Sequence, residues 1–217
     1  MIGAEAPHDP SHRRAKRLLD LAVVVPLAVV LAPVFVGVWL AMAANMLRCR
    51  RDRGGWLYRE RRVSRGREFD LLKFRTLRTE ALERMRADAG HARMYEDDTA
   101  NLTWAGRRVL KPWYLDELPQ LANVLRGRMT LVGPRPWPPS MVADQVAKGH
   151  DYRLHVTPGW TGPAQVSKGR REATFTELDL AYIERLRTAG AWALVRGDLK
   201  ILRETVRTMF RGEGLRF

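Results

Sequence analysis

A long uncharged segment near the N-terminus constrains this chain more than any other feature. No Asp, Glu, Lys or Arg occurs from Leu21 to Leu47, and nearly every residue in the segment is apolar. Its length exceeds the roughly 20 residues that a helix needs to cross a bilayer. The segment is also too long and too far from the start to be the apolar region of a standard secretory signal. The sequence therefore predicts contact with a membrane.

Basic clusters lie on both sides of this segment, at Arg13 to Arg17 and at Arg48 to Arg53. Positive charge is retained on the cytoplasmic side of a membrane, so a simple span would place one cluster on the unfavoured side. Pro33 lies near the middle and can bend a helix. A helix that bends at Ala32-Pro33 and returns would keep both clusters on one side. Because ordinary membrane spans also tolerate proline, these features leave spanning and re-entry both open.

The charge balance of the 217 residues narrows the class of partner. A formal net charge of +14 indicates an anionic partner, which is a nucleic acid, a membrane surface or a phosphorylated substrate. The apolar segment and the lack of a recognisable nucleic-acid-binding module argue against a nucleic acid. Cys49 is the single cysteine, so no internal disulfide can form.

The stretch from Leu115 to Pro136 carries the clearest chemistry. It opens with the adjacent carboxylates Asp116 and Glu117, and helix-spaced apolar residues follow. It closes with Gly133-Pro134-Arg135-Pro136, a rigid turn that presents one arginine. This pattern predicts a short helix with two acids near its N-terminus, a candidate site for a metal and a phosphate. Acids in the first turn also stabilise an ordinary helix, so the pair alone does not establish a site.

Cations elsewhere in the chain could serve the same site. A strand predicted from Glu68 to Leu77 carries Lys73 and Arg75, and Lys111 precedes the acid pair. Taken alone, Lys73 and Arg75 are better explained as solvated charges on a half-exposed strand. A last helix is predicted from Asp198, and its basic residues could face either anionic lipid headgroups or solvent.

Several segments, taken together, resemble the bacterial sugar transferases. These are monotopic phosphoglycosyl transferases, which begin glycan assembly on polyprenyl phosphate. The matches follow the family's order and cover almost the whole chain beyond the first fifteen residues. They are Lys16-Arg17-Leu18-Leu19-Asp20, Lys73-Phe74-Arg75-Thr76, Leu115-Asp116-Glu117-Leu118-Pro119-Gln120-Leu121, Asn123-Val124-Leu125, Gly133-Pro134-Arg135-Pro136, Pro158-Gly159-Trp160-Thr161-Gly162 and Gln165.

The resemblance implies an α/β fold that is mostly helical with short strands. We expect a flexible basic tail over residues 1–15, a re-entrant membrane hairpin over 16–47 and a cytoplasmic catalytic domain over 48–217 with amphipathic membrane-surface helices. The chain is expected to hold the catalytic unit alone. Family members place the bend of the hairpin at a residue pair, usually Ser-Pro, that corresponds to Ala32 and Pro33, which favours re-entry. The implied location is the bacterial inner membrane, with the catalytic domain on the cytoplasmic face.

The resemblance also implies a reaction and the residues that perform it. A nucleotide (UDP-) sugar would give its sugar-1-phosphate to polyprenyl (undecaprenyl) phosphate through a covalent intermediate on Asp116, assisted by Glu117. Asp116 and Glu117 would hold Mg²⁺. The sequence carries no signature of the sugar, the glycan pathway or the oligomeric state. The expected phosphate-binding residues are Lys73, Arg75, Arg135 and Lys111, which stands where the family usually has arginine.

A second interpretation is a catalytically silent membrane adaptor that kept the fold and binds other glycan-assembly proteins. The intact Asp116, Glu117 and Arg135 argue against it. Release of a nucleoside monophosphate from a nucleotide sugar would distinguish the enzyme from the adaptor.

Overall fold

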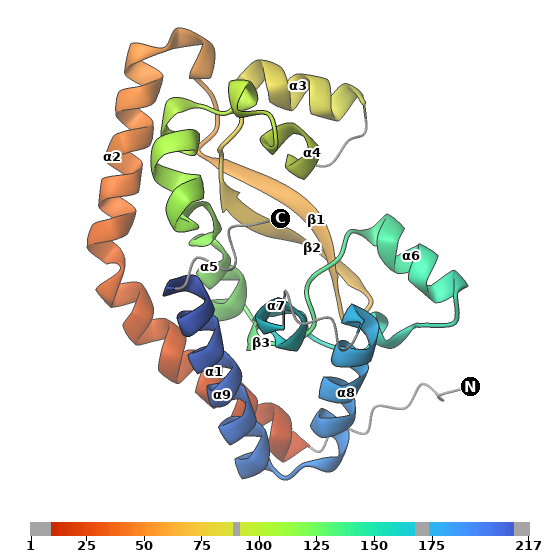
Figure 1. The fold of residues 1–217 in the computed structure, drawn as a ribbon. Coiled ribbons are helices and arrows are strands. Elements are labelled where there is room, and N and C mark those ends of the chain that lie inside the picture. Colours follow the sequence, from red (N-terminus) through yellow and green to blue (C-terminus); the bar gives the residue numbers. More distant parts are fainter. Residues whose placement is uncertain (1–9, 89–91, 168–173, 211–217) are drawn as a thin grey trace. The chain divides into compact units, whose positions relative to one another are not determined.

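The computed structural model describes residues 10–88, 92–167 and 174–210 (Figure 1). As predicted, this part of the chain is mostly helical with short strands. The helices are α1 Pro10–Val30, α2 Ala32–Arg48, α3 Thr79–Ala87, α4 Ala92–Glu96, α5 Gln120–Leu125, α6 Pro139–Ala147, α7 Pro163–Val166, α8 Phe175–Thr188 and α9 Ala191–Phe210. The strands are β1 Leu57–Ser64, β2 Arg67–Phe74, β3 Thr130–Val132 and β4 Gly159–Thr161.

The N-terminal tail predicted over residues 1–15 lies mainly outside the described residues. From residue 10 onward the chain is already helical, because α1 begins at Pro10. Proline is well tolerated in the first turn of a helix, where its missing N–H has no helical partner in any case. The boundary of the tail at residue 15 stays a prediction.

The chain packs as two compact units made of interleaved segments. Unit 1 comprises Met1–Pro26, Glu60–Leu71 and Ala122–Phe217, and unit 2 comprises Leu27–Arg59 and Leu72–Leu121. The boundary falls inside the β1–β2 hairpin, so each of these strands contributes to both units. This division concerns packing alone, and the functional division at residues 15 and 47 stays a prediction.

Helix α2 contributes to the hydrophobic core of unit 2. Val38 and Met42, one helical turn apart, are buried with Phe74, Leu110 and Leu118. Two ring contacts extend this packing. Phe35 meets Phe74 edge-on with ring centroids 5.9 Å apart, and Trp39 stacks on Trp56 at 4.9 Å.

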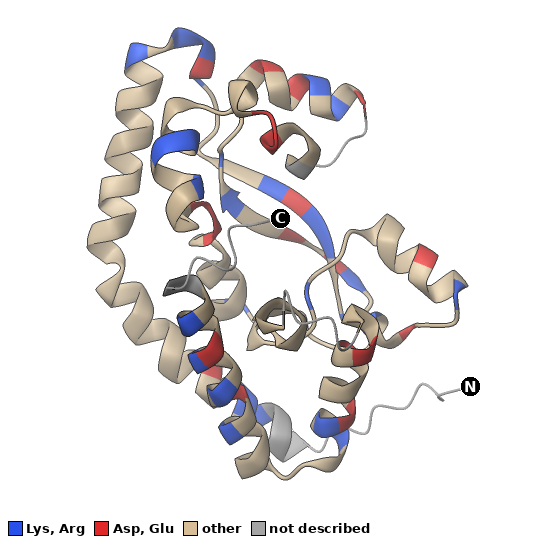
Figure 2. Cartoon of the chain, viewed as in Figure 1, with Lys and Arg blue, Asp and Glu red and all other residues tan. Residues whose placement is uncertain are grey.

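The opposite side of α2 leaves large apolar side chains exposed. Val36, Leu40 and Leu47 are 58%, 62% and 75% exposed. Figure 2 shows no charge along α2 until its C-terminal end, where the basic cluster begins. An uncharged helix with one apolar face packed and the other bare fits a surface that meets lipid.

A break at Leu31 separates α1 from α2, one residue before the bend predicted at Ala32-Pro33. Pro33 lies in the first turn of α2, where its ring costs no helical hydrogen bond within that helix. The chain is hydrogen-bonded on both sides of the break, from Leu31 N to Leu27 O and from Phe35 N to Leu31 O, each 2.9 Å.

No single helix in the described part of the chain is long and apolar enough to cross a membrane. One pair passes the same criteria when taken together, namely Arg14–Val30 with Ala32–Arg48, which are bent by 55° at the break. The pair has the length and composition of a broken span or a re-entrant loop.

In unit 1, β3 pairs in parallel with β4, with Thr130 opposite Gly159 and Val132 opposite Thr161. The pairing is extremely close at its glycines. A Cβ atom on Gly159 would lie 2.1 Å from the backbone nitrogen of Gly133, so a side chain is excluded there. Two segments that carried the resemblance, at Gly133–Pro136 and Pro158–Gly162, therefore meet backbone to backbone.

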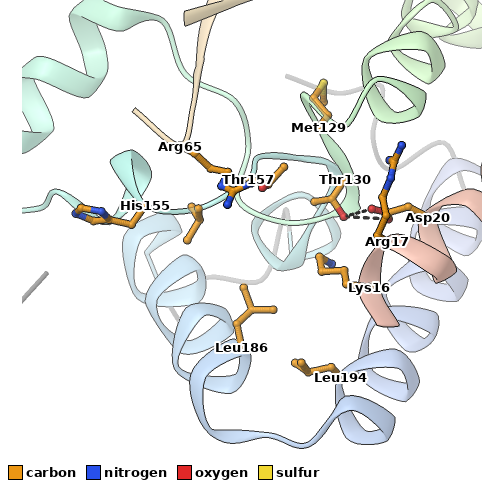
Figure 3. Close-up of a pocket in the computed structure, with 12 residues that line it drawn as sticks. Lys16, Arg17, Asp20, Arg65, Met129, Thr130, His155, Thr157, Leu186 and Leu194 are labelled. Atoms are coloured by element: carbon orange, nitrogen blue, oxygen red, sulfur yellow. Dashed lines mark hydrogen bonds between the residues drawn. The ribbon is translucent and has the colours of Figure 1, made fainter. Parts of the chain in front are cut away.

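Unit 1 also contains a cavity of about 310 Å³ (Figure 3). Its walls combine the basic Lys16 and Arg17 of α1 with apolar side chains such as Met129, Leu186 and Leu194. None of the residues predicted to act in catalysis or to bind phosphate lines it. The cavity thus does not coincide with the predicted site.

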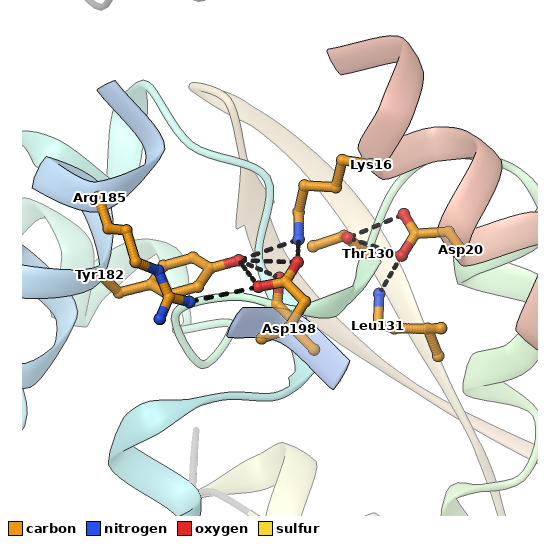
Figure 4. Close-up of polar contacts among 8 residues, drawn as sticks. Lys16, Asp20, Thr130, Leu131, Tyr182, Arg185 and Asp198 are labelled. Carbon is orange, nitrogen blue, oxygen red and sulfur yellow. Dashed lines mark hydrogen bonds and ion pairs between the residues drawn. The ribbon is translucent and has the colours of Figure 1, made fainter. Parts of the chain in front are cut away.

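Lys16 and Asp20 of the Lys16–Asp20 motif anchor α1 within unit 1 (Figure 4). Lys16 Nζ lies 2.5 Å from Asp198 Oδ2 and 2.9 Å from the Tyr182 hydroxyl. Asp20 accepts hydrogen bonds from the Thr130 hydroxyl and the Leu131 amide, both 2.9 Å from its Oδ1. Lys16 and Asp20 therefore tie α1 to β3, α8 and α9.

Helix α9 begins at Ala191, seven residues before the predicted start at Asp198. Asp198 therefore lies within the helix rather than at its cap, and its buried carboxylate accepts a hydrogen bond from Tyr182. Trp192, Leu199 and Val206 recur every seven residues and are exposed, and Lys200, Arg203 and Arg207 are exposed as well. The helix is amphipathic as expected, while its place on a membrane surface stays a prediction.

Candidate active site

The acid pair lies in a tight turn of unit 2 rather than in an α-helix. Asp116 and Glu117 belong to the 3₁₀ turn Leu115–Glu117, and Pro119 separates this turn from α5. The acids were expected in the first turn of the short helix, but they lie in a separate turn just before it. Tyr114 immediately precedes this turn and has φ 53° and ψ 24°, a left-handed conformation that is unfavourable for a bulky side chain. Such strain is found where a structure holds a functional side chain in place.

Asp116 is buried, with only 3% of its surface exposed. Its Oδ2 lies 3.7 Å from Lys111 Nζ. Lys111 in turn is hydrogen-bonded to Glu96, and the Thr76 hydroxyl donates to the other carboxylate oxygen of Glu96 at 2.6 Å. A polar chain thus runs from Thr76 through Glu96 and Lys111 to the acid.

Burial raises the pKa of Asp116 to about 6. The positive charges of Lys111 and Lys73 oppose this shift, whereas the negative charges of Glu117 and Glu96 add to it. Burial also disfavours the charged form of Lys111, but the three acids around it outweigh that cost and raise its pKa above the ordinary value. The site therefore holds a buried carboxyl group with a raised pKa beside a lysine that stays protonated.

Glu96 is a site residue that sequence reasoning missed. The prediction placed Tyr95 to Ala100 in an acidic loop, whereas Glu96 ends α4 and fixes Lys111. An acidic stretch on the surface has no feature that would single out one member. Only the fold brings Glu96 next to a lysine fifteen residues later.

The two predicted phosphate ligands on β2 and just after it differ in their surroundings. Lys73 is half-buried, and its charge acts on Asp116. Arg75 is 4% exposed, and its guanidinium donates to the backbone carbonyls of Gly55 at 2.8 Å, Leu77 at 3.0 Å and Asp52. These bonds account for Arg75 as an organiser of the surrounding loops, and its role as a phosphate ligand stays a prediction.

Arg135 belongs to unit 1, and its side chain is exposed. Pro134 and Pro136 restrict the backbone on both sides of it. Its own carbonyl accepts a hydrogen bond of 2.6 Å from Arg153 Nη1. The loop is therefore rigid while the side chain is available, which suits the predicted contact with a phosphate.

The acid pair fits Mg²⁺ as a partner of a bound diphosphate. In the described residues, no three or more His, Cys, Asp and Glu side chains form a group that could hold a metal ion by themselves. Mg²⁺ commonly takes only one or two carboxylates from a protein and completes its shell with substrate phosphates and water. Asp116 and Glu117 supply that number of hard oxygen donors.

The buried charge leads to a prediction about stability. In the absence of Mg²⁺ and substrate, Asp116→Asn should raise the thermal midpoint of the purified protein at pH 7.5. The unfolded chain loses the Asp116 proton near pH 3.8 and the folded chain near pH 6, so stability falls as pH rises between these values. The loss amounts to about 3 kcal/mol, at 1.36 kcal/mol per pKa unit, and asparagine avoids it.

Thermal unfolding of both proteins from pH 4 to 8 would measure this effect. The two midpoints should be close at pH 4 and should separate up to about pH 6. An Asp116→Asn variant that is less stable than the parent at pH 7.5 would contradict the prediction.

Comparison with known proteins places the chain in a family. The family model described as bacterial sugar transferase matches residues 11–212. The chain belongs to the bacterial sugar transferase family. The match covers every predicted site residue, from Ala32 to Arg135. The family assignment made from the ordered motifs is thereby confirmed.

Three relatives illustrate the match. The undecaprenyl-phosphate galactose phosphotransferase of Salmonella typhimurium is 33% identical over 94% of this chain and 42% of its own length. The UDP-glucose:undecaprenyl-phosphate glucose-1-phosphate transferase of Caulobacter vibrioides is 36% identical over 88% of this chain and 68% of its own length. A UDP-N-acetylgalactosamine-undecaprenyl-phosphate N-acetylgalactosaminephosphotransferase of Aeromonas hydrophila is 31% identical over 99% of this chain and 48% of its own length. The chain thus spans less than half the length of the Salmonella and Aeromonas proteins.

Proposed function

We propose that this bacterial sugar transferase moves a sugar-1-phosphate from a UDP-sugar to undecaprenyl phosphate. The products would be undecaprenyl-diphosphate-sugar and UMP, the first membrane step in the assembly of a glycan such as an exopolysaccharide, capsule or O-antigen. The observation that carries the proposal is the buried Asp116, whose pKa is raised to about 6 beside Lys111. The names of the three relatives describe the same class of reaction with different sugars.

In the proposed mechanism, a carboxylate oxygen of Asp116 attacks the phosphorus atom that bears the sugar. A bond forms between this oxygen and the phosphorus, and the bond from that phosphorus to the oxygen bridging the two phosphates breaks. UMP leaves with the bridging oxygen and its electron pair. An oxygen of undecaprenyl phosphate then attacks the same phosphorus, and the bond to Asp116 breaks. The carboxylate is regenerated, as expected for nucleophilic catalysis by a carboxylate.

The environment of Asp116 supports this role. A carboxylate whose charge is poorly stabilised in the free enzyme gains more from losing that charge in an acyl phosphate than a well-solvated carboxylate does. Lys111 and Lys73 supply positive charge where the transferred phosphoryl group would develop negative charge. Arg135 is proposed to hold the diphosphate of the donor. Mg²⁺, held by Asp116 and Glu117, would neutralise charge on the diphosphate.

The bent helix pair is proposed to enter the cytoplasmic face of the bacterial inner membrane and return to it. Basic clusters on both flanks and the exposed apolar face of α2 support this topology. The catalytic residues would then lie on the cytoplasmic side, where nucleotide sugars are made available as donors.

Cysteine labelling in intact cells would test the topology. Ala15→Cys and Gly54→Cys would be placed singly in a Cys49→Ser background, and neither change removes a charge. A Cβ atom at Gly54 makes only ordinary contacts. Neither cysteine should react with a membrane-impermeant thiol reagent until the membrane is opened. Labelling of one site in sealed cells would mean that the segment spans.

The reaction itself would be tested with the purified protein, undecaprenyl phosphate and a panel of UDP-sugars. The panel would include UDP-galactose, UDP-glucose and UDP-N-acetylgalactosamine. We expect release of UMP that depends on a donor, together with formation of a lipid-diphosphate-sugar. Absence of both products with every donor, from folded protein, would instead favour the silent adaptor.

A further inference from the structure

Arg153 lies beneath the loop that carries Arg135, and each of its three guanidinium nitrogens has a different acceptor. Its Nη1 donates to the carbonyl of Arg135 at 2.6 Å, its Nε to Gln145 Oε1 at 2.9 Å and its Nη2 to Asp179 Oδ2 at 2.5 Å. The side chain is 6% exposed. Arg153 therefore joins the Arg135 loop to α6 and α8 from inside unit 1.

The same guanidinium also holds the chain just after Arg135. Its central carbon lies 4.0 Å from the ring centroid of Trp137, a cation–π contact. On the other side of Arg135, the loop is fixed by strand pairing, with Gly133 N donating to Thr161 O at 2.9 Å and Gly159 N to Pro134 O at 2.8 Å. The backbone of Arg135 is thus held before, at and after the residue.

The partner of Arg153 is shaped for this task. Asp179 is 1% exposed, and its Oδ2 accepts from Arg153 and, at 3.2 Å, from the Tyr152 hydroxyl. Its Oδ1 has no hydrogen-bond partner in the described structure. A buried ion pair of this kind adds little stability compared with apolar packing, because both charges lose their hydration. We therefore attribute to this pair a geometric role rather than a stabilising one.

We propose that Arg153 is a positioning residue, which fixes the Gly133–Pro136 loop so that Arg135 is aimed at its phosphate. This inference rests on the proposed function, in which Arg135 contacts the donor diphosphate. Arg153 would touch neither substrate nor reacting atoms, and its effect on the reaction would pass through Arg135. The planar fork of arginine is required, since one lysine ammonium cannot serve the three separate acceptors in this geometry.

A double-mutant cycle with Arg153→Lys and Arg135→Ala would test the inference. Arg135→Ala alone should lower kcat/KM by about 10²-fold, as for loss of one charge-stabilising group. Arg153→Lys alone should lower kcat/KM by about 10-fold, because it leaves the loop misplaced rather than absent. In the Arg135→Ala background, Arg153→Lys should change kcat/KM by less than about 2-fold, because the residue through which it acts is gone.

Asp198→Asn is the matched control. Asp198 is also 1% exposed and also pairs with a cation, but its hydrogen bonds in the described structure go to Lys16, Tyr182 and Arg185 (Figure 4). The factor by which Asp198→Asn changes kcat/KM should be the same in the parent and in the Arg135→Ala background. Should Arg153→Lys fail to fold, Asp179→Asn, which keeps the shape of the carboxylate, would replace it in the cycle.

Equal losses for Arg153→Lys with and without Arg135 would overturn the inference, as would parent-like kinetics of Arg153→Lys. If the parent protein transfers no phosphosugar, the proposed function fails, and the same cycle is measured on the dissociation constant for UDP. Coupling between the two sites in that measurement would support positioning without catalysis. Absence of UDP binding to the parent, or additive effects on it, would overturn the inference.

Discussion

Replacing Asp116 by asparagine is expected to abolish turnover, lowering kcat by at least about 10³-fold, as for loss of a catalytic nucleophile. An amide cannot form the acyl phosphate through which the phosphosugar would pass. Because asparagine also removes a buried charge whose pKa is raised to about 6, the variant should be at least as stable as the parent. A loss of activity without a loss of stability would then identify a chemical role.

UMP release and the mass of the intact protein after exposure to donor alone would measure this effect. The intact parent should gain the mass of one phosphosugar, and after digestion that mass should be found on the peptide that contains Asp116. Asp116→Asn should gain none. Asp97→Asn, a nearby exposed acid on the same unit, is the control and should behave like the parent. A phosphosugar trapped on another residue of the parent would refute the assignment of Asp116.

Removal of divalent ions should stop the reaction, and added Mg²⁺ should restore it. Asp116 and Glu117 together would repel a diphosphate unless a cation lay between them. Because Glu117 is proposed as a ligand, Glu117→Gln should raise the Mg²⁺ concentration that gives half-maximal activity. Glu83→Gln, an exposed acid on α3, should leave that concentration unchanged.

The measurement is UMP release across a Mg²⁺ titration after treatment with chelator. Full activity in excess chelator would rule out a metal requirement. An unchanged Mg²⁺ dependence in Glu117→Gln would mean that Glu117 acts in another way, for example by orienting Asp116.

Several expectations succeeded because they depend on local sequence. The strand predicted from Glu68 to Leu77 corresponds to β2 at Arg67–Phe74, since alternating apolar residues define a strand by themselves. The bend in the apolar segment was located within one residue, because proline restricts the backbone directly around it.

The start of α9 was missed by seven residues, because Asp198 resembles a helix cap in sequence but is a buried ion-pair partner in the fold.

The candidate site was predictable only in part. The sequence indicated the acid pair and the candidate cations, because each of them belongs to a short motif that can be recognised without the fold. The sequence did not reveal that the Arg75 guanidinium donates hydrogen bonds to the carbonyls of Gly55, Leu77 and Asp52. Nor did it reveal that Lys111 is hydrogen-bonded to Glu96. Those roles depend on which distant segments meet, and one solvated charge looks like another in a sequence.

The sequence by itself determined the long apolar segment, the family and the position of the acid pair. The apolar segment follows from composition, the acid pair from adjacent residues, and the family from short motifs in a fixed order along the chain. Only the tertiary structure decided that Asp116 is buried with a raised pKa and that Arg153 supports the loop of Arg135. A pKa is set by desolvation and by charges brought near from other segments, and a loop is held by hydrogen bonds that close over long separations in sequence. Both effects exist only once the chain has folded.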